Sequence, residues 1–355
     1  MIHPHSFTKE WIDAVSSTLQ FNDKNLIEKV VRAMSLLEML KESGCPFVFK
    51  GGTALMLALA DSTHRLSIDI DIICPPRTEI EDYLSKYASH GFTEFELVER
   101  QQRGTDIPKS HSKLFYQIAY KPDATTSSFI LLDVLYEEDY YTKLQTVPIE
   151  SPFVKLEGTP LTVSVPSIED LIGDKMTAFA PNTTGIPYIK SGKSTSMEII
   201  KQLYDIGRLF ERVTNLEVAS NTFKKVALIE LSYRSLQENL AVVYEDIRQT
   251  ALCISTRGVE GTGDFKALQD GILRIKSFMF QDRYTIEDAI VDASRAAYLA
   301  TLIEKESNTI ERYSGDPLEV SQMTIQSSLT NKLNKLKKTS PEAFYYWSRA
   351  SELLL

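Results

Sequence analysis

Two aspartates one residue apart are the residues whose types and spacing point most directly to chemistry. Asp69 and Asp71 lie in the run LSIDIDIIC, in which isoleucines alternate with polar residues. This alternation is typical of a β-strand with one buried face, and it places both carboxylates on the other face with Cα atoms about 6.5–7 Å apart. Mg²⁺ binds one or two carboxylates and completes its octahedron with water and phosphate oxygens. We therefore interpret Asp69 and Asp71 as metal ligands, although acids that only solvate a sheet face would give the same pattern.

A glycine pair precedes these aspartates. The run PFVFKGG predicts a short buried strand closed by a tight turn at Gly51 and Gly52, and TALMLALA resumes helical spacing. Glycine lets the backbone approach a ligand closely, and a helix N-terminus offers free N–H groups to an anion. Thr53 adds a hydroxyl at the start of the predicted helix. A Gly-Gly turn is common by itself, but strand, turn, helix and aspartate strand in succession place a phosphate site beside the metal ligands.

Asp133 is a third candidate carboxylate, in the otherwise apolar run SFILLDVLY. Burying a carboxylate is costly unless it is paired or bound to a metal. If its strand lies beside the aspartate strand, Asp133 completes a triad that binds the catalytic metal and accepts the proton of an attacking hydroxyl. The alternative is an acid on the exposed face of an edge strand.

The elements that must position these residues change in kind along the chain. Apolar spacing predicts helices within residues 6–44, then strands up to about 136, with a helix over 80–91 between them. After Pro166, Ser167 is a good N-cap, and from about residue 197 one helix follows another. We therefore expect a mixed α/β core over residues 1–165 and a helical domain over 166–355, with the active site in the cleft between them.

Composition limits the class of protein. Three widely spaced cysteines indicate reduced thiols, and the chain shows neither a signal peptide nor a long apolar run. We expect a soluble, cytoplasmic protein without membrane contact. The net charge of −9 is unusual for a dedicated nucleic-acid binder. A cluster of lysines offers the best RNA patch, although a solvated helix face explains it as well: Lys332, Lys335, Lys337 and Lys338. Three histidines lack metal-ligand spacing and are interpreted as lone surface residues: His64, His90 and His111.

The runs FKGGTAL and HRLSIDIDI together resemble the AbiEii/MenT-type nucleotidyltransferase toxins, a DUF1814-like family of bacterial toxin–antitoxin systems. The pattern Gly-Gly-Thr-Ala-Leu, then Arg-x-Ser-x-Asp-x-Asp, is met by Gly51, Gly52, Thr53, Ala54, Leu55, Arg65, Ser67, Asp69 and Asp71. A second element is matched by Asp174-Lys175 and by Lys201 with Asp205. The match covers residues 46–210, and the helical remainder agrees only in kind.

The resemblance implies a nucleotidyltransferase fold and transfer of a nucleoside monophosphate from an NTP to an acceptor hydroxyl, with two Mg²⁺ ions. Lys175 would then contact the triphosphate; its alternative is a solvated lysine. Asp205 would contact the nucleotide or orient that lysine, unless it forms a surface pair with Lys201. The catalytic residues would be Asp69, Asp71, Asp133 and Lys175, the first three as metal ligands, and the nucleotide-binding residues would be Lys50, Gly51, Gly52, Thr53, Arg65, Ser67 and Asp205.

Two of these assignments have simple structural alternatives, since Arg65 can form an internal ion pair and Ser67 a hydrogen bond at the strand entry. The resemblance also implies a tRNA 3′ end as acceptor and a separately encoded antitoxin, although the negative charge argues against tRNA. The enzymatic alternatives are a protein or small-molecule acceptor. A catalytically silent binding partner with the same fold is the alternative from another class.

Overall fold

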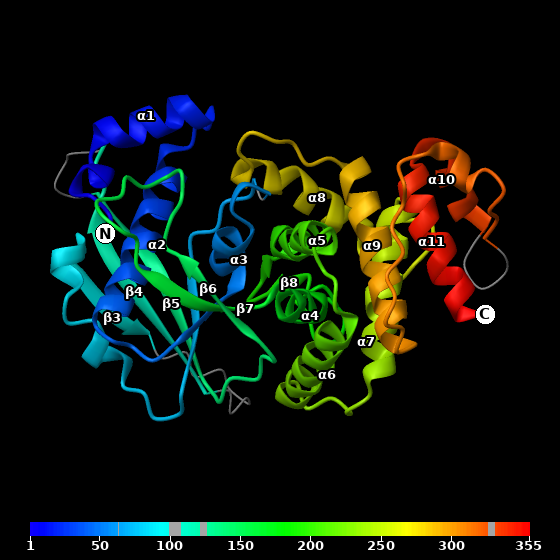
Figure 1. The fold of residues 1–355 in the computed structure, drawn as a ribbon, viewed down its shortest axis with the longest axis horizontal. Coiled ribbons are helices and arrows are strands. Elements are labelled where there is room, and N and C mark those ends of the chain that lie inside the picture. Colours follow the sequence, from blue (N-terminus) through cyan, green and yellow to red (C-terminus); the bar gives the residue numbers. More distant parts are fainter. Residues whose placement is uncertain (63, 99–107, 121–125, 326–330) are drawn as a thin grey trace. The chain divides into compact units, whose positions relative to one another are not determined.

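The computed structural model describes residues 1–62, 64–98, 108–120, 126–325 and 331–355. The chain forms two compact units (Figure 1). The first consists of Met1–Ser167 together with Ser277–Arg283, and the second consists of Ile168–Lys276 together with Tyr284–Leu355. The mixed α/β class predicted from the sequence is confirmed.

The first unit is built on a five-stranded mixed sheet in the order β1-β2-β5-β4-β3. The strands β2 and β5 are parallel, and the other neighbouring pairs are antiparallel. The sheet strands are β1 (Val48–Lys50), β2 (Ile70–Cys74), β3 (Glu94–Val98), β4 (Lys109–Gln117) and β5 (Ser127–Tyr136), and a separate pair is formed by β6 (Leu144–Pro148) and β7 (Thr162–Pro166). The helices are α1 (Lys9–Leu19), α2 (Lys24–Glu42) and α3 (Gly51–Leu59), with short 3₁₀ turns η1 (Pro4–Phe7) and η2 (Ala60–Ser62).

One face of this sheet forms the core of the first unit. The helix α2 begins at the N-cap Asp23, whose side chain accepts from the Leu26 N–H, and it lies against the sheet (Figure 1). Strand residues of alternate positions pack with α2 in one apolar cluster that includes Phe49, Ile72, Leu132, Val134 and Leu114. The intervening positions of β1, β2, β4 and β5 therefore lie on the other face.

Two sequence-based expectations about this unit were wrong in detail. Residues 80–91 do not form one helix but two 3₁₀ turns, η3 (Ile80–Tyr83) and η4 (Tyr87–His90). Only Ile80 and Leu84 of this stretch are fully buried, which anchors a single turn. The strand predicted from Leu66 begins only at Ile70, because the preceding residues pair with the segment 277–283: Arg65 bridges Met279, and the Leu66 N–H donates to the Phe278 carbonyl at 2.8 Å.

The second unit is helical, as the sequence predicted. Its helices are α4 (Ile168–Ala178), α5 (Ser196–Phe210), α6 (Leu216–Tyr233), α7 (Leu240–Ser255), α8 (Phe265–Ile275), α9 (Ile286–Glu304), α10 (Leu336–Thr339) and α11 (Pro341–Leu354). The short elements are the hairpin of β8 (Ile189–Lys190) with β9 (Lys193–Ser194), and the 3₁₀ turns η6 (Pro317–Val320) and η7 (Asn331–Lys335). A further 3₁₀ turn, η5 (Lys276–Phe278), starts at the last residue of one segment of this unit and continues into the segment that belongs to the first unit. The aromatic run of α11 is buried, and the Trp347 indole donates to the Ser255 hydroxyl at 2.9 Å.

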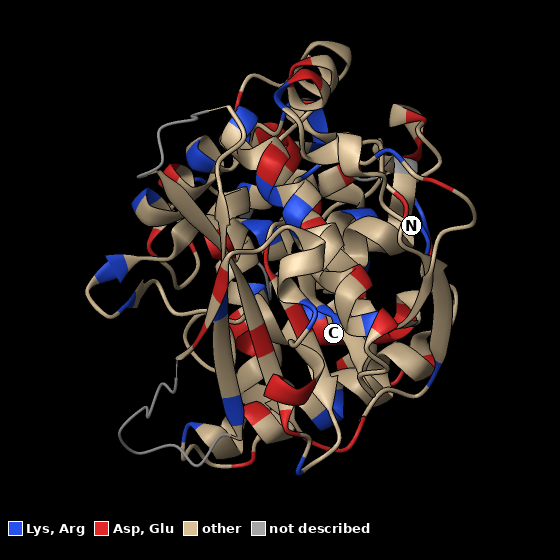
Figure 2. Cartoon of the chain, turned by 90° about the vertical axis from the view of Figure 1, so that its left-hand side faces the viewer, with Lys and Arg blue, Asp and Glu red and all other residues tan. Residues whose placement is uncertain are grey.

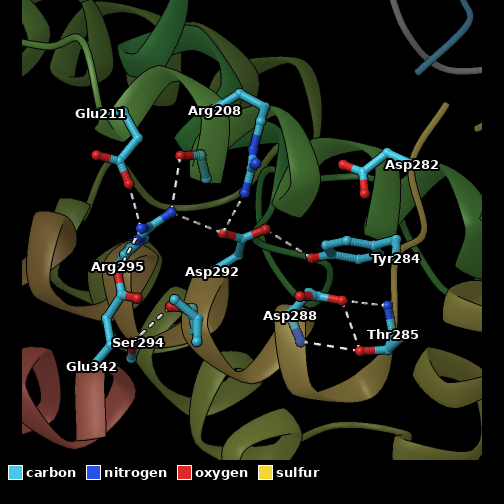
Figure 3. A network of polar contacts seen from close by, with 12 residues as sticks. Arg208, Glu211, Asp282, Tyr284, Thr285, Asp288, Asp292, Ser294, Arg295 and Glu342 are labelled. Carbon is cyan, nitrogen blue, oxygen red and sulfur yellow. Dashed lines mark hydrogen bonds and ion pairs between the residues drawn. The ribbon is translucent and has the colours of Figure 1, made fainter. Parts of the chain in front are cut away.

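A group of charged side chains lies at the centre of this second unit, and we call it the Asp292 cluster (Figure 3). It joins α5, α9 and α11 and consists of Arg208, Glu211, Tyr284, Asp292, Arg295 and Glu342. The carboxylate of Asp292 lies 3.3 Å from the Arg295 guanidinium and 3.5 Å from that of Arg208, and it accepts from the Tyr284 hydroxyl at 3.0 Å. Burial raises the pKa of Asp292 to about 6, against the opposing effect of both arginines.

All three cysteines, Cys45, Cys74 and Cys253, are buried and free. Within the described residues, no helix combines the length and the apolar character that crossing a bilayer requires.

Candidate active site

Four polar side chains form a line across the sheet of the first unit, and we call them the polar row. Lys50 of β1 is the cross-strand partner of Asp71 on β2, Asp71 is the partner of Asp133 on β5, and Asp133 is the partner of His111 on β4. Directly paired residues of neighbouring strands project from the same face of a sheet. The polar row therefore lies on the face opposite the apolar core packed under α2.

Asp133 lies in an interior strand of the sheet, because β5 has β2 on one side and β4 on the other. The alternative of an acid on an edge strand is therefore wrong. The Asp133 side chain is 33% exposed and that of His111 is 18% exposed. The Nδ1 atom of His111 lies 2.5 Å from Oδ1 of Asp133. Since a carboxylate only accepts hydrogen bonds, Nδ1 carries the proton and donates it.

The interpretation of His111 as a lone surface residue was wrong, and this histidine is the site residue that sequence reasoning missed. Its neighbours in the sequence, SHSK, give no metal-ligand spacing. What brings His111 to Asp133 is the register between β4 and β5, in which the two residues are cross-strand partners. His90 on η4 is also paired, with Glu42 at the C-terminal end of α2, at 3.2 Å.

The two glycines fit closely against the acidic side chains and their neighbours. Gly51 has a φ of +78°, and a Cβ atom there would lie 2.1 Å from Oδ2 of Asp71. A Cβ on Gly52 would lie 2.7 Å from the Ser67 hydroxyl and 2.9 Å from Nη2 of Arg65. A larger residue at Gly51 would displace the Asp71 carboxylate, and one at Gly52 would displace the Ser67 and Arg65 side chains, so glycine permits both close approaches.

The helix α3 begins at Gly51 directly beside the polar row. Its N-cap residue is Lys50, whose side chain makes no capping hydrogen bond and instead donates to the Tyr140 hydroxyl at 3.0 Å. The first N–H groups of a helix have no partners within the helix, and they carry the positive end of its dipole. The N-terminus of α3 is therefore suited to an anion next to Asp71.

Thr53 and Asp69 are linked through the backbone. The Thr53 hydroxyl donates to the Asp69 carbonyl at 2.7 Å, and Thr53 is fully buried. Asp69 is exposed and lies one residue before β2. This hydrogen bond fixes the backbone that carries the Asp69 carboxylate at the entry to the strand.

Arg65 is 4% exposed, and its guanidinium donates to the Leu66 carbonyl at 3.0 Å. It lies against Gly52 together with Ser67. These contacts give Arg65 a structural function in the segment that leads into β2.

The carboxylates of the polar row suit a magnesium ion in number and kind. Asp71 and Asp133 are neighbours on one face, and Mg²⁺ takes one or two carboxylates besides water and phosphate oxygens. Among the residues that the structure describes, no set of three or more His, Cys, Asp or Glu side chains is arranged to hold a metal. The three predicted ligands are therefore not preassembled as one cluster, and Asp69 stands apart from the other two by its exposed position ahead of the strand.

Lys175 and Asp205 face each other in the second unit. The Lys175 ammonium lies 2.9 Å from Oδ2 of Asp205 and donates to Gln202 at 3.0 Å. The Lys175 side chain is 7% exposed and that of Asp205 is fully buried. These contacts exclude a solvated lysine, and they exclude a surface position for Asp205. The helices α4 and α5 bring the pair together.

The candidate site thus combines neighbouring carboxylates with a glycine turn at a helix start, on a mixed α/β core, and this combination suits a phosphate with its metal ion. A family model described as "Nucleotidyl transferase AbiEii toxin, Type IV TA system" matches residues 35–274. The chain belongs to this family of toxin nucleotidyltransferases, and the resemblance stated from the motifs is confirmed.

Comparisons with individual proteins add little to the family match. No curated protein matches the chain. Among solved structures, JHP933 from Helicobacter pylori is 15% identical, with a TM-score of 0.39, over 80% of this chain and 91% of that one. MenT4, a nucleotidyltransferase toxin from Mycobacterium tuberculosis H37Rv, is 10% identical, with a TM-score of 0.47, over 82% of this chain and 89% of its own.

Proposed function

We propose that this chain transfers a nucleoside monophosphate from an NTP to an acceptor hydroxyl, with release of pyrophosphate, and that the polar row is its catalytic centre. The observation that carries the proposal is the close approach of Gly51 to Asp71, which sets the N-terminus of α3 beside two neighbouring carboxylates. A helix N-terminus binds phosphate, and the carboxylates bind its counter-cation.

The residues of the polar row then have distinct roles. Asp71 and Asp133 hold magnesium, with Asp69 as a further ligand from the strand entry. The metal ions, when bound, stabilise the charge that develops on the attacking and leaving oxygens. Asp133 accepts the proton of the attacking hydroxyl through Oδ2, since Oδ1 accepts from His111. The backbone N–H groups that follow Gly51 and Gly52 hold the phosphates, and Lys50 adds a positive charge beside them.

The pair of Lys175 and Asp205 has the chemistry of a triphosphate clamp. Lys175 donates to Asp205 and to Gln202, so its one remaining N–H points in a fixed direction, and an ammonium is a good point charge for phosphate. We propose that this pair contributes to NTP binding and that Asp205 orients the lysine.

The acceptor that we propose is the 3′ end of a tRNA, with a separately encoded antitoxin that counteracts the activity. The family description, a nucleotidyltransferase toxin of a type IV toxin–antitoxin system, supports the antitoxin, and the tRNA acceptor follows the resemblance stated from the motifs. Charge does not add to it, because in the part of the chain that the structure describes basic and acidic positions are interspersed (Figure 2). In the predicted basic cluster, Lys332 pairs with Glu260 at 2.6 Å and Lys337 donates to the backbone carbonyls of Ser321 and Met323. Two of the four lysines are thus engaged within the chain, and Lys335 and Lys338 remain exposed for RNA contact.

The proposal is tested by incubating the protein with each labelled NTP, magnesium and total tRNA, and by separating the products by size. We expect label in RNA of tRNA length, lost when tRNA is omitted. Label in protein or in a small molecule would establish one of the alternative acceptors. No label with any NTP in a whole lysate, from folded protein, would instead favour the catalytically silent binding partner.

A further inference from the structure

We propose that His111 is a positioning residue that fixes the Asp133 carboxylate for its metal ion. This inference rests on the proposed magnesium site at Asp71 and Asp133. His111 lies outside the motifs that carry the family resemblance, and its role follows from the register of β4 against β5.

The hydrogen bond between these two residues restricts Asp133 in a defined way. His111 donates from Nδ1 to Oδ1 of Asp133 at 2.5 Å, which occupies one of the two carboxylate oxygens. The imidazole is anchored on an interior strand, and its side chain is only 18% exposed, so it holds a narrow range of positions. Asp133 is therefore held in one orientation, and Oδ2 remains for a cation or an acceptor hydroxyl.

The neighbouring carboxylate of Asp71 makes this restraint necessary. Asp71 and Asp133 are cross-strand partners on the same face, where like charges repel. His111 lies on the other side of Asp133 from Asp71, because β4 and β2 flank β5 on opposite sides. Its hydrogen bond holds Oδ1 on the β4 side, which leaves Oδ2 on the side of Asp71 for a shared cation. Without this donor, the Asp133 carboxylate would be free to rotate, and Oδ2 would no longer be held in that position.

Removing a group that orients a metal ligand commonly weakens metal binding by about 10–100-fold. We therefore expect His111→Ala to raise the Mn²⁺ dissociation constant by about 10-fold or more. The probe is Mn²⁺, titrated by electron paramagnetic resonance with and without a nonhydrolysable NTP analogue. In the transfer assay, the magnesium concentration for half-maximal rate should rise by a similar factor, while the KM for NTP at saturating magnesium stays the same.

Two substitutions separate the hydrogen bond from the bulk of the ring. Asn places its amide N–H close to the position of Nδ1, so His111→Asn should bind Mn²⁺ nearly as well as wild type. Phe keeps the ring and removes the donor, so His111→Phe should behave like His111→Ala. A role in packing alone would give the opposite order, with Phe tolerated and Asn not.

His90 provides a matched control, since it also pairs with a carboxylate in the first unit, at 3.2 Å from Glu42. His90→Ala should leave Mn²⁺ binding and transfer unchanged. Unfolding in urea shows whether each variant is folded before its metal affinity is compared.

The outcomes distinguish this inference from the proposed function. If wild type binds Mn²⁺ but transfers no nucleotide, the proposed function is wrong. Weaker Mn²⁺ binding by His111→Ala would still support the role of His111 in that case. Equal Mn²⁺ affinities for wild type and His111→Ala would overturn the role of His111, even if transfer is observed. Wild type that binds no Mn²⁺ would overturn both.

Discussion

The polar row of the first unit and the Asp292 cluster of the second unit are both built from charged side chains, but they arrange those charges in opposite ways. In the polar row, two carboxylates are direct neighbours on a face where Asp133 is one-third exposed. In the Asp292 cluster, the central carboxylate is 1% exposed and is surrounded by two guanidinium groups and a tyrosine hydroxyl (Figure 3).

The difference separates our candidate site from a structural centre. Two neighbouring carboxylates favour the binding of an added cation or proton, so the polar row suits a metal ion. A buried carboxylate with several donors is already satisfied, and removing one partner would leave a buried charge. The two regions share one local feature: a glycine, which lacks a Cβ atom, leaves room for the carboxylate. A Cβ would lie 2.1 Å from Asp71 if placed on Gly51, and 2.0 Å from Asp292 if placed on Gly207.

The sharpest test of the comparison is Asp71→Asn. This change keeps the shape of the side chain and removes its charge, so nucleotide transfer should fall by roughly 1,000-fold, because a metal clamp contributes several kcal/mol to the transition state. The free energy of unfolding should stay the same or rise slightly, since the repulsion from Asp133 is relieved. Label incorporation and urea unfolding measure the two quantities. A folded Asp71→Asn protein that transfers nucleotide at the wild-type rate would show that the polar row is not the catalytic site.

The sequence predicted the elements that depend on local patterning. The alternation around Asp71, the Gly51-Gly52 turn and the strand of Asp133 were all read from short-range periodicity, and the structure has a strand, a helix start and a strand at these places. Alternation depends on the two faces of a single strand, so no knowledge of its neighbours is needed.

Features that depend on pairing between distant elements were not predictable in the same way. His111 becomes a site residue only through the register of β4 with β5, which no residue of β4 specifies alone. Lys175 resembles a surface lysine in the sequence, and its burial follows from the packing of α4 on α5. The Asp292 cluster joins three helices, so its members are far apart in the chain.

The Lys175–Asp205 pair tests whether a buried charge pair can also serve a site. Lys175→Met leaves the fully buried Asp205 without its ammonium, and it should reduce the free energy of unfolding by about 3–5 kcal/mol. The double change Lys175→Met with Asp205→Leu removes both charges and should recover most of that loss. If the lysine binds phosphate, transfer stays low in the double variant. Recovery of transfer along with stability would show that the pair is only structural.

Two glycines with nearly equal positive φ angles test the close approach at the site. Gly51 and Gly44 have φ values of +78° and +76°, but a Cβ on Gly44 would meet nothing within 4 Å. Alanine at either position should cost about 1–2 kcal/mol of stability, because L-residues disfavour this conformation. Gly51→Ala should in addition displace Asp71 and abolish most of the transfer, whereas Gly44→Ala should retain it. Similar transfer rates for the two variants, compared at equal folded fractions, would contradict the proposed role of the glycine turn.

We expect the Asp292 cluster to make the free energy of unfolding depend on pH. Burial raises the pKa of Asp292 from 3.8 to about 6, so between these values the folded state holds a proton that the unfolded state has lost. The stability contributed by the protonated carboxyl is complete below the unfolded pKa and is lost as the pH rises through the folded pKa. Asp292→Asn cannot ionise and lacks this dependence.

The measurable quantity is therefore the stability of wild type minus that of Asp292→Asn. From pH 5 to pH 7 this difference should fall by roughly 1 kcal/mol, which follows from the two pKa values by linkage. Urea unfolding at both pH values measures it, and the subtraction removes the titration of groups that both proteins share. A difference that rises with pH would mean that Arg208 and Arg295 outweigh burial and hold the carboxylate ionised. In that case the cluster would be a fully charged ion-pair network, and its contrast with the polar row would rest on the pairing of opposite charges alone.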